Sequence, residues 1–197
     1  MRTTFQAALD QLEAAVHEEA ELVKRALRGA VTALVHQDSE GHNGIVYPGL
    51  AQRMSAGSGI QHSEKNDAAE PVRYVQMWVR PDEVDLPPSY QQAEVDDSLS
   101  TGELIPIASG LPKHASTTAI RINQRNAGLY AARLTPGASV QLPTAPYVHL
   151  FVALGTITLE GAGPLNTSDA ARLIASDGPQ VTAGPEGAEI LAWEMRP

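Results

Sequence analysis

The stretch that decides the fold covers residues 48–64 and reads PGLAQRMSAGSGIQHSE. A Pro-Gly turn begins it, a strand-like pattern follows, and Gly57 and Gly59 permit a tight bend before His62 and Glu64. Because residues two apart on a strand share a face, His62 and Glu64 project together. A His-x-Glu pair suits a divalent ion such as Fe(II) or Mn(II), which generally needs about three or four protein ligands. The pair is therefore half of a metal site, and the other ligands have to come from elsewhere.

Short strands are predicted on both sides of this stretch, because apolar runs alternate with turns rich in Gly, Pro, Asn and Asp. The runs cover 44–47, 72–79, 104–108, 117–122, 128–134, 149–154, 156–160 and 189–194. Regularly spaced short strands favour a sandwich or a barrel. A stretch rich in proline and acidic residues interrupts them, and it predicts a linker at 82–102 between a partial N-terminal half at 36–81 and a C-terminal half at 103–197.

The N-terminal segment follows a different period. Its apolar residues recur at steps of three and four, which is typical of one stripe of a helix, at Phe5, Leu9, Leu12, Val16, Ala20, Val23, Leu27, Ala30 and Leu34. The sequence predicts one long amphipathic α-helix over residues 1–35. Its apolar face has to be buried, so we expect either a homodimer through this helix or a helix that docks on the sheet.

The composition excludes several classes of function. The chain has 14 Lys and Arg against 23 Asp and Glu, a formal charge of -9, which disfavours direct binding to nucleic acid or to an anionic membrane. It contains no cysteine, so a metal has to be held by histidine and carboxylate. The first thirty residues do not have the layout of a signal peptide, and no apolar run is long enough to span a bilayer. A cytoplasmic protein is expected.

A resemblance to a known family covers about residues 36–197. Residues 36–39, 41–44, 48–64, 65–67, 70–71 and 76–79, which read HQDS, GHNG, PGLAQRMSAGSGIQHSE, KND, EP and QMWV, resemble the pirin family. The resemblance implies a mainly β protein with two cupin halves, of the double-stranded β-helix or jelly-roll type, the first of them incomplete here and preceded by the predicted helix. It also implies quercetin 2,3-dioxygenase activity and a metal in the N-terminal cupin, while the C-terminal cupin usually holds none.

The same resemblance assigns roles to individual residues. His62 and Glu64 match the family's His-x-Glu pair and are expected to bind a divalent metal, Fe(II) before Mn, Ni, Cu or Zn, with Glu64 also acting as a base. Gln52 and Met54 alternate on one strand and are expected to line the substrate cavity, where a small flavonol-like molecule binds. A core methionine and a buried, hydrogen-bonded glutamine are an equal alternative for these two residues.

The sequence departs from the family before residue 36. The family's second ligand pair, a His-x-His, occurs nowhere in the chain, so the metal site is expected to be impaired or empty. On a helix His17 and Glu19 point about 200° apart and cannot replace it. Residues 1–35 instead resemble the first helix of PhoU-type phosphate-signalling regulators, which suggests a chain that joins two different proteins.

The remaining histidines are predicted to have no role in chemistry. His36 and His42 flank a polar turn and are expected in a solvated hairpin, His114 is expected at the surface, and His149 is expected to be a hydrogen-bonded structural residue. Three functions therefore stay open. They are a metal-dependent oxygenase, a non-catalytic pirin-like interaction protein, and a PhoU-like regulator that binds a partner through residues 1–35.

Overall fold

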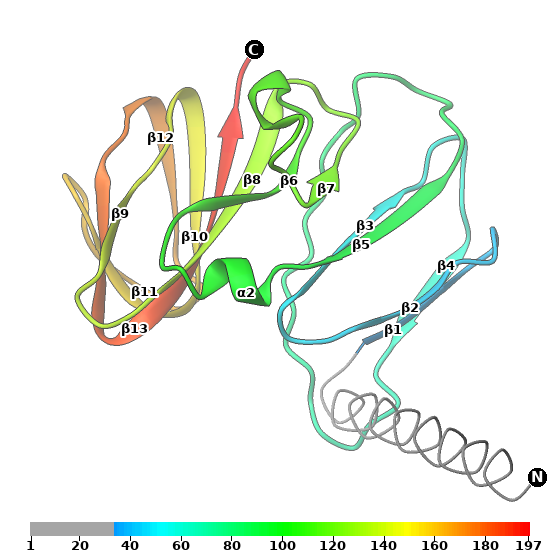
Figure 1. The fold of residues 1–197 in the computed structure, drawn as a ribbon, viewed down its shortest axis with the longest axis horizontal. Helices are drawn as coiled ribbons and strands as arrows, with labels where there is room; N and C mark the ends of the chain where they lie inside the picture. The colour runs from blue at the N-terminus through cyan, green and yellow to red at the C-terminus, as the bar shows by residue number, and fades with distance from the viewer. Residues whose placement is uncertain (1–33) are drawn as a thin grey trace, which may run out of the picture. The chain divides into compact units, whose positions relative to one another are not determined.

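The computed structural model describes residues 34–197, and these divide into two compact units. One unit contains residues 34–48 and 62–74, and the other contains residues 49–61 and 75–197. Both are built from β-strands, and a long segment without strands, residues 66–88, follows β4 (Figure 1). The predicted boundaries at 36–81, 82–102 and 103–197 remain predictions.

The first unit is a three-stranded antiparallel sheet with the order β2-β1-β4. Its strands are β1 (Leu34–Asp38), β2 (Asn43–Val46) and β4 (His62–Lys65). Along β1 the side chains of Leu34 and His36 are buried, whereas Gln37 is exposed. This period of two is the pattern of a strand with one buried face and one exposed face. His36 lies on the buried face, together with Leu34.

The second unit contains a two-stranded and an eight-stranded sheet. Strands β3 (Leu50–Ser55) and β5 (Ser89–Glu94) form the first, and the short helix α2 (Asp96–Leu99) follows β5. The larger sheet has the order β11-β10-β13-β8-β6-β7, with β12 paired to β10 and β9 paired to β13. Its strands are β6 (Ile105–Ser109), β7 (Ile120–Arg121), β8 (Ala127–Leu134), β9 (Ser139–Gln141), β10 (Thr144–Leu159), β11 (Gly163–Asn166), β12 (Ala170–Asp177) and β13 (Gln180–Met195), and the 3₁₀ turn η1 (Pro112–His114) follows β6.

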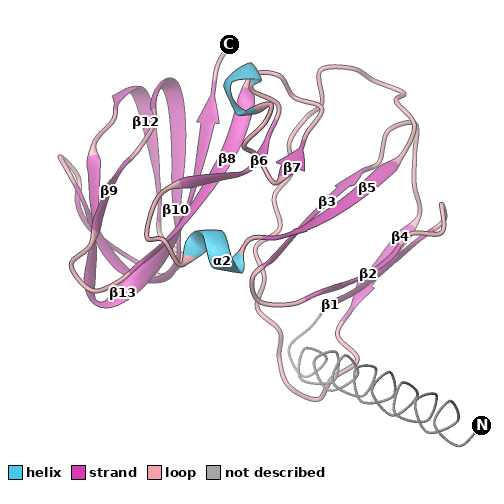
Figure 2. Ribbon diagram, viewed as in Figure 1, coloured by secondary structure: helices cyan, strands magenta, loops and turns pink. Residues whose placement is uncertain are grey.

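The long strands β10 and β13 organise the core of this unit (Figure 2). Alternate residues of β10, namely Val148, Leu150 and Val152, are buried and join Ile190 and Ala192 of β13 in one cluster. The two strands pair from Tyr147 to Leu159 with shifts in register at Val152–Leu154 and Gly155–Ile157. Such bulges bend a strand and increase its twist, which lets one sheet curve around its own core.

The fold-class prediction is correct for the β-structure but wrong for the long amphipathic helix. Within residues 34–197 the helical segments are only α2 and η1, and Leu34 and Val35, the last residues of the predicted helix, begin strand β1. At this point the alternation of buried and partly buried side chains has a period of two, so the sheet decides the local structure. The rest of the predicted helix, residues 1–33, lies outside the described residues, and the homodimer expected through it stays a prediction.

No helix within residues 34–197 is long and apolar enough to cross a membrane.

Candidate functional site

The first unit places His62 and Glu64 on one face of β4, as their spacing predicts. In the antiparallel register Glu64 is opposite His36 and His62 is opposite Asp38. Opposite residues in such a ladder point to the same side, so four side chains with metal-binding or proton-binding groups share one face of the sheet. We call His36, Asp38, His62 and Glu64 the β1–β4 polar face.

His36 lies between two carboxylates. Its Nδ1 atom is 3.4 Å from Oε1 of Glu64, and its Nε2 atom is 3.4 Å from Oδ2 of Asp38. The side chains of His36 and Asp38 are fully buried, and that of Glu64 is 15% exposed. The rings of His36 and His62 are stacked at a centroid distance of 6.0 Å. The prediction that His36 occupies a solvated hairpin is therefore wrong.

Asp38 is held by the turn that joins β1 to β2. Its Oδ1 atom accepts hydrogen bonds from the backbone N–H groups of Glu40 and His42, and its Oδ2 atom is 2.8 Å from Nδ1 of His42. Burial by itself raises the pKa of Asp38, but the hydrogen bonds from His42, His36 and Glu40 outweigh it and lower the pKa to about 2. Asp38 is therefore an anion at neutral pH. It lies at the end of the β1–β4 polar face that is next to the turn between β1 and β2.

The donor atoms of this face suit a divalent ion, because imidazole nitrogen and carboxylate oxygen bind Fe(II), Mn(II), Ni(II) and Zn(II). Nevertheless, no group of three or more His, Asp or Glu side chains within residues 34–197 is arranged to hold a metal. His62 and Glu64 thus fit the chemistry of two ligands, and the described part of the chain does not complete the set. The predicted impairment of the metal site remains a prediction.

Gln52 and Met54 lie on β3, in the second unit. Met54 is opposite Tyr90 of β5, and Tyr90 donates a hydrogen bond of 2.6 Å from its hydroxyl to Oε1 of Gln52. All three side chains are partly buried. A hydrogen-bonded glutamine was one of the two alternatives for this position, and a role of Gln52 and Met54 in a substrate cavity remains a prediction.

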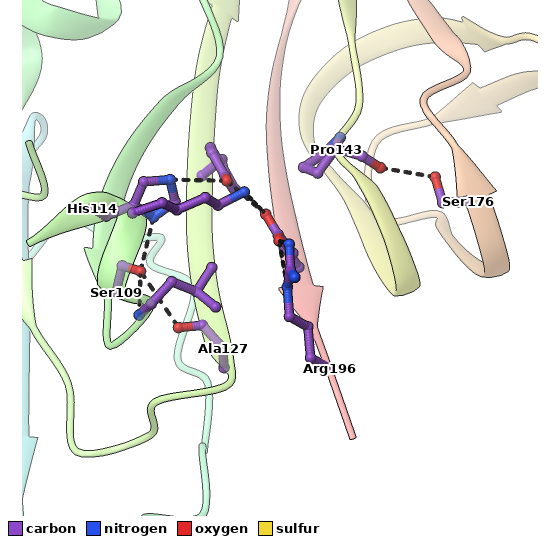
Figure 3. A network of polar contacts seen from close by, with 10 residues as sticks. Ser109, His114, Ala127, Pro143, Ser176 and Arg196 are labelled. Carbon is purple, nitrogen blue, oxygen red and sulfur yellow. Dashed lines mark hydrogen bonds and ion pairs between the residues drawn. The ribbon is translucent and has the colours of Figure 1, made fainter.

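A second polar site, which the sequence did not reveal, lies inside the eight-stranded sheet of the second unit (Figure 3). Glu194 of β13 is fully buried and accepts hydrogen bonds from Tyr130 (2.7 Å), Lys113 (2.6 Å) and Arg196 (2.9 Å). Nε2 of His114 is 3.1 Å from the Tyr130 hydroxyl, and its Nδ1 is 2.9 Å from Oγ of Ser109. We call these six residues the Glu194 network.

The hydrogen bonds determine which nitrogen of His114 carries the proton. Tyr130 donates its only hydroxyl proton to Glu194, so it accepts from His114 Nε2–H. In the neutral imidazole Nδ1 is then the acceptor, and the Ser109 hydroxyl lies between Nδ1 at 2.9 Å and the carbonyl of Ala127 at 3.5 Å. Burial and the neighbouring Lys113 lower the pKa of His114, against the influence of Glu194. The predicted surface position of His114 is wrong, because only 8% of this residue is exposed.

The Glu194 network makes the second unit sensitive to acid. Burial raises the pKa of Glu194, but hydrogen bonds from Lys113, Tyr130 and Arg196 outweigh it, so the net shift is downward. A lowered pKa in the folded protein means that protons bind the unfolded chain more readily. This effect begins as the pH falls below 6.5 for His114 and below 4.5 for Glu194, which are their ordinary pKa values.

We expect the free energy of unfolding to fall as the pH is lowered from 7 to 4. Urea unfolding at several pH values measures it, and a His114→Gln variant should flatten the upper part of the curve. A profile that is flat in the wild type would contradict the assignment.

Two β-units with mainly antiparallel strands, one of them with a His-x-Glu pair on a strand, have the features of the cupin class. Comparison with known proteins narrows the class: the pirin family model matches residues 3–79. A Mycobacterium tuberculosis protein named "Putative quercetin 2,3-dioxygenase" is 53% identical over 180 residues, which are 91% of this chain and 71% of the relative. The chain belongs to the pirin family. The match from residue 3 onward extends the family resemblance into the segment before residue 36, and the similarity of that segment to PhoU-type regulators stays a prediction.

Two further relatives describe the breadth of the family. The quercetin 2,3-dioxygenase of Escherichia coli is 29% identical over 183 residues, which are 92% of this chain and 74% of that protein. The crystal structure of the bacterial pirin YhhW from Escherichia coli, in complex with nickel(II), has a TM-score of 0.69 at 24% identity and covers 84% of this chain and 69% of YhhW. The structural likeness supports the pirin fold.

Proposed function

We propose that this protein is a metal-dependent oxygenase of the quercetin 2,3-dioxygenase type, in which His62 and Glu64 bind the metal and the substrate is a small flavonol-like molecule. The observation that carries the proposal is the shared face of β4, where an imidazole and a carboxylate point to the same side beside the buried His36. The names of the relatives support the type of reaction. Cupins outside this type bind other substrates, so the reaction has to be tested directly.

The residues of the β1–β4 polar face have separate tasks in this proposal. A divalent metal, when bound, polarises the neighbouring oxygen atoms of the flavonol and promotes attack by O2. Glu64 takes the proton from the substrate hydroxyl, since a carboxylate at this place can act as ligand and as base. His62 contributes a neutral nitrogen donor. We also propose that Gln52 and Met54, on β3 of the second unit, line a substrate cavity.

The identity of the metal is part of the proposal. Fe(II) is the first choice because imidazole and carboxylate donors with open positions are typical of non-haem iron oxygenases. Nickel(II) is the second choice, because YhhW was crystallised with it. Mn(II), Cu(II) and Zn(II) are also compatible with these donors.

A non-catalytic interaction protein is the second candidate function. It is favoured by one observation, that within residues 34–197 no three or more His, Asp or Glu side chains are arranged so that they could hold a metal. In that case the β1–β4 polar face is a structural feature, and the protein acts through its surface.

Metal content decides between the two functions. We expect protein loaded with Fe(II) under anaerobic conditions, or with Ni(II), to retain about one ion per chain and to consume quercetin together with O2. His62→Ala and Glu64→Gln should each lose the metal and the activity. His149→Ala is the matched control, because it replaces a histidine of β10 in the other unit. This variant should retain both the metal and the activity.

Retention well below one ion that is unchanged in the His62 and Glu64 variants would contradict the oxygenase proposal. It would leave the interaction protein as the working hypothesis.

A further inference from the structure

We propose that Arg53 binds an oxyanion, the carboxylate or phosphate group of a small molecule, and that Ser55 and Ser89 hold its guanidinium group in position for this. All three residues belong to the second unit. Gln52 and Met54 alternate with Arg53 along β3, so they lie on the other face of the strand. The site is therefore separate from the function proposed above and does not depend on a metal.

The charge of Arg53 is the first support. Only two arginines within residues 34–197 are not exposed, Arg53 and Arg133. Arg133 forms ion pairs with the carboxylates of Asp96 and Glu189, which raise its pKa. The bonds of Arg53 to described residues go to two neutral hydroxyl groups, and burial lowers its pKa. A partly buried cation without a counter-charge is unfavourable, so an anion from outside the chain is a suitable partner.

The orientation of the guanidinium group is the second support. Nη1 of Arg53 donates hydrogen bonds to Oγ of Ser55 at 2.6 Å and to Oγ of Ser89 at 2.7 Å. Ser55 and Ser89 are opposite each other where β3 pairs with β5 (Figure 1). The backbone N–H of Ser58 donates to the carbonyl of Leu86 at 2.8 Å, which joins the chain after β3 to the chain before β5. The group is therefore held in one orientation before a ligand arrives.

The other edge of the guanidinium group is the third support. Nε of Arg53 is buried and has no hydrogen-bond partner within residues 34–197. Nε–H and one N–H of Nη2 point the same way, and this pair is the fork that binds the two oxygens of a carboxylate or phosphate. Nη2 is not shielded from solvent as Nε is, so a ligand approaches from the Nη2 side. A small shift of the surrounding side chains then lets the second oxygen provide the buried Nε–H with an acceptor.

The class of ligand follows from this geometry. A water molecule supplies an acceptor for Nε–H but leaves the charge of Arg53 uncompensated, whereas an oxyanion supplies both. The chain has a formal charge of -9, which disfavours loose attraction of anions to the surface. Binding therefore depends on the local arrangement at Arg53. Carboxylate and phosphate present similar oxygens to the fork, and separate titrations tell them apart.

The test follows the side-chain Nε–H signal of Arg53 by NMR in the full chain labelled with ¹⁵N-arginine, and loss of the signal in Arg53→Gln assigns it. Sodium phosphate and sodium acetate are titrated separately, against sodium chloride at equal ionic strength. We expect a saturable shift with at least one of the two oxyanions and none with chloride. The oxyanion that shifts the signal identifies the group, and a response to both assigns a site for either. A signal that responds to neither would overturn the proposal.

Variants connect binding to the fork. Arg53→Lys retains the positive charge but lacks the paired N–H groups. We expect its dissociation constant for the oxyanion that shifts the signal, measured by isothermal titration calorimetry, to rise about 10- to 100-fold, which is the range for hydrogen bonds to a charged group. Ser89→Ala removes one of the two hydroxyls that hold Arg53 and should change affinity in the same direction. Arg172→Gln removes an exposed arginine of β12 in the same unit and is the matched control, which should bind as the wild type does.

An affinity in Arg53→Lys and Ser89→Ala equal to that of the wild type would overturn the role of the fork. If Arg53→Lys does not fold, Ser89→Ala provides the same comparison. Thermal unfolding does not replace these measurements, because phosphate stabilises folded proteins in general by its exclusion from their surface.

Discussion

Replacing Glu194 by alanine is expected to lower the free energy of unfolding by about 3 kcal/mol. The carboxylate is fully buried and accepts hydrogen bonds from Tyr130, Lys113 and Arg196. Its removal leaves the Tyr130 hydroxyl without its acceptor in the interior, and it leaves Lys113 and Arg196, whose side chains are each 47% exposed, without their counter-charge. Urea unfolding followed by circular dichroism measures the change.

Glu189 on the same strand is the matched control. It pairs with Arg133 at 2.6 Å, but both side chains are about one third exposed, at 34% and 38%. Ion pairs in such positions contribute about 1 kcal/mol or less, so Glu189→Ala should have a small effect. Similar losses in the two variants would show that the Glu194 network is no more important to stability than an ordinary surface pair.

Replacing Gly155 by alanine is expected to cost about 3 kcal/mol, through two separate effects. Gly155 lies on β10 at the shift in register with β13, and its φ angle of +77° is unfavourable for a residue with a side chain. A Cβ atom would also lie 2.1 Å from the carbonyl oxygen of Gly187, so the backbone of one strand would have to move. Thermal or urea unfolding of the variant measures the sum.

Gly137→Ala separates the two effects. Gly137 has a similar φ angle of +73°, but a Cβ atom there would have no heavy atom within 4 Å. This variant should lose only the backbone term, about 1 to 2 kcal/mol. If Gly155→Ala and Gly137→Ala lowered the free energy of unfolding equally, β10 and β13 could move apart locally without cost. That result would contradict the close approach of Gly155 to the carbonyl oxygen of Gly187.

Local patterns in the sequence were sufficient for part of the fold and of the candidate site. The two-residue spacing of His62 and Glu64 correctly predicted that they share a face of β4, because a strand places alternate residues on one side. The segments predicted at 149–154 and 156–160 lie in β10, apart from residue 160, and β10 continues as one strand through its bulges. Gly155 suggested a turn between two strands, but the structure has one continuous strand there, and only its register against β13 changes.

Other features depend on contacts that no local pattern contains. Leu34 fitted the last step of a helical stripe, yet Leu34 and His36 follow a period of two in β1. Had the strand been extended back to Leu34, His36 would have been placed on the buried face. The Glu194 network draws side chains from β6, η1, β8 and β13, far apart in sequence, so His114 could not be distinguished from a surface residue by its neighbours alone.

Residues 72–79 show how far strand propensity depends on a partner. They are rich in Val, Tyr and Trp, and a strand was predicted there, but the structure has no strand in this segment and Trp78 is 91% exposed. Strand propensity describes how well side chains pack on a sheet. A hydrogen bond of 3.1 Å from Nε1 of Trp193 to the sulfur of Met77 links this segment to β13.

The position of β13 has a consequence for synthesis of the protein. In the order β11-β10-β13-β8-β6-β7 this strand lies in the middle, yet it is made after all the others. Until the ribosome has released residues 180–195, β10 and β8 lack the strand that pairs with both of them. Their apolar side chains are exposed to solvent during this time. The large sheet therefore closes late, in one step between distant segments, and the nascent chain needs protection from aggregation during that interval.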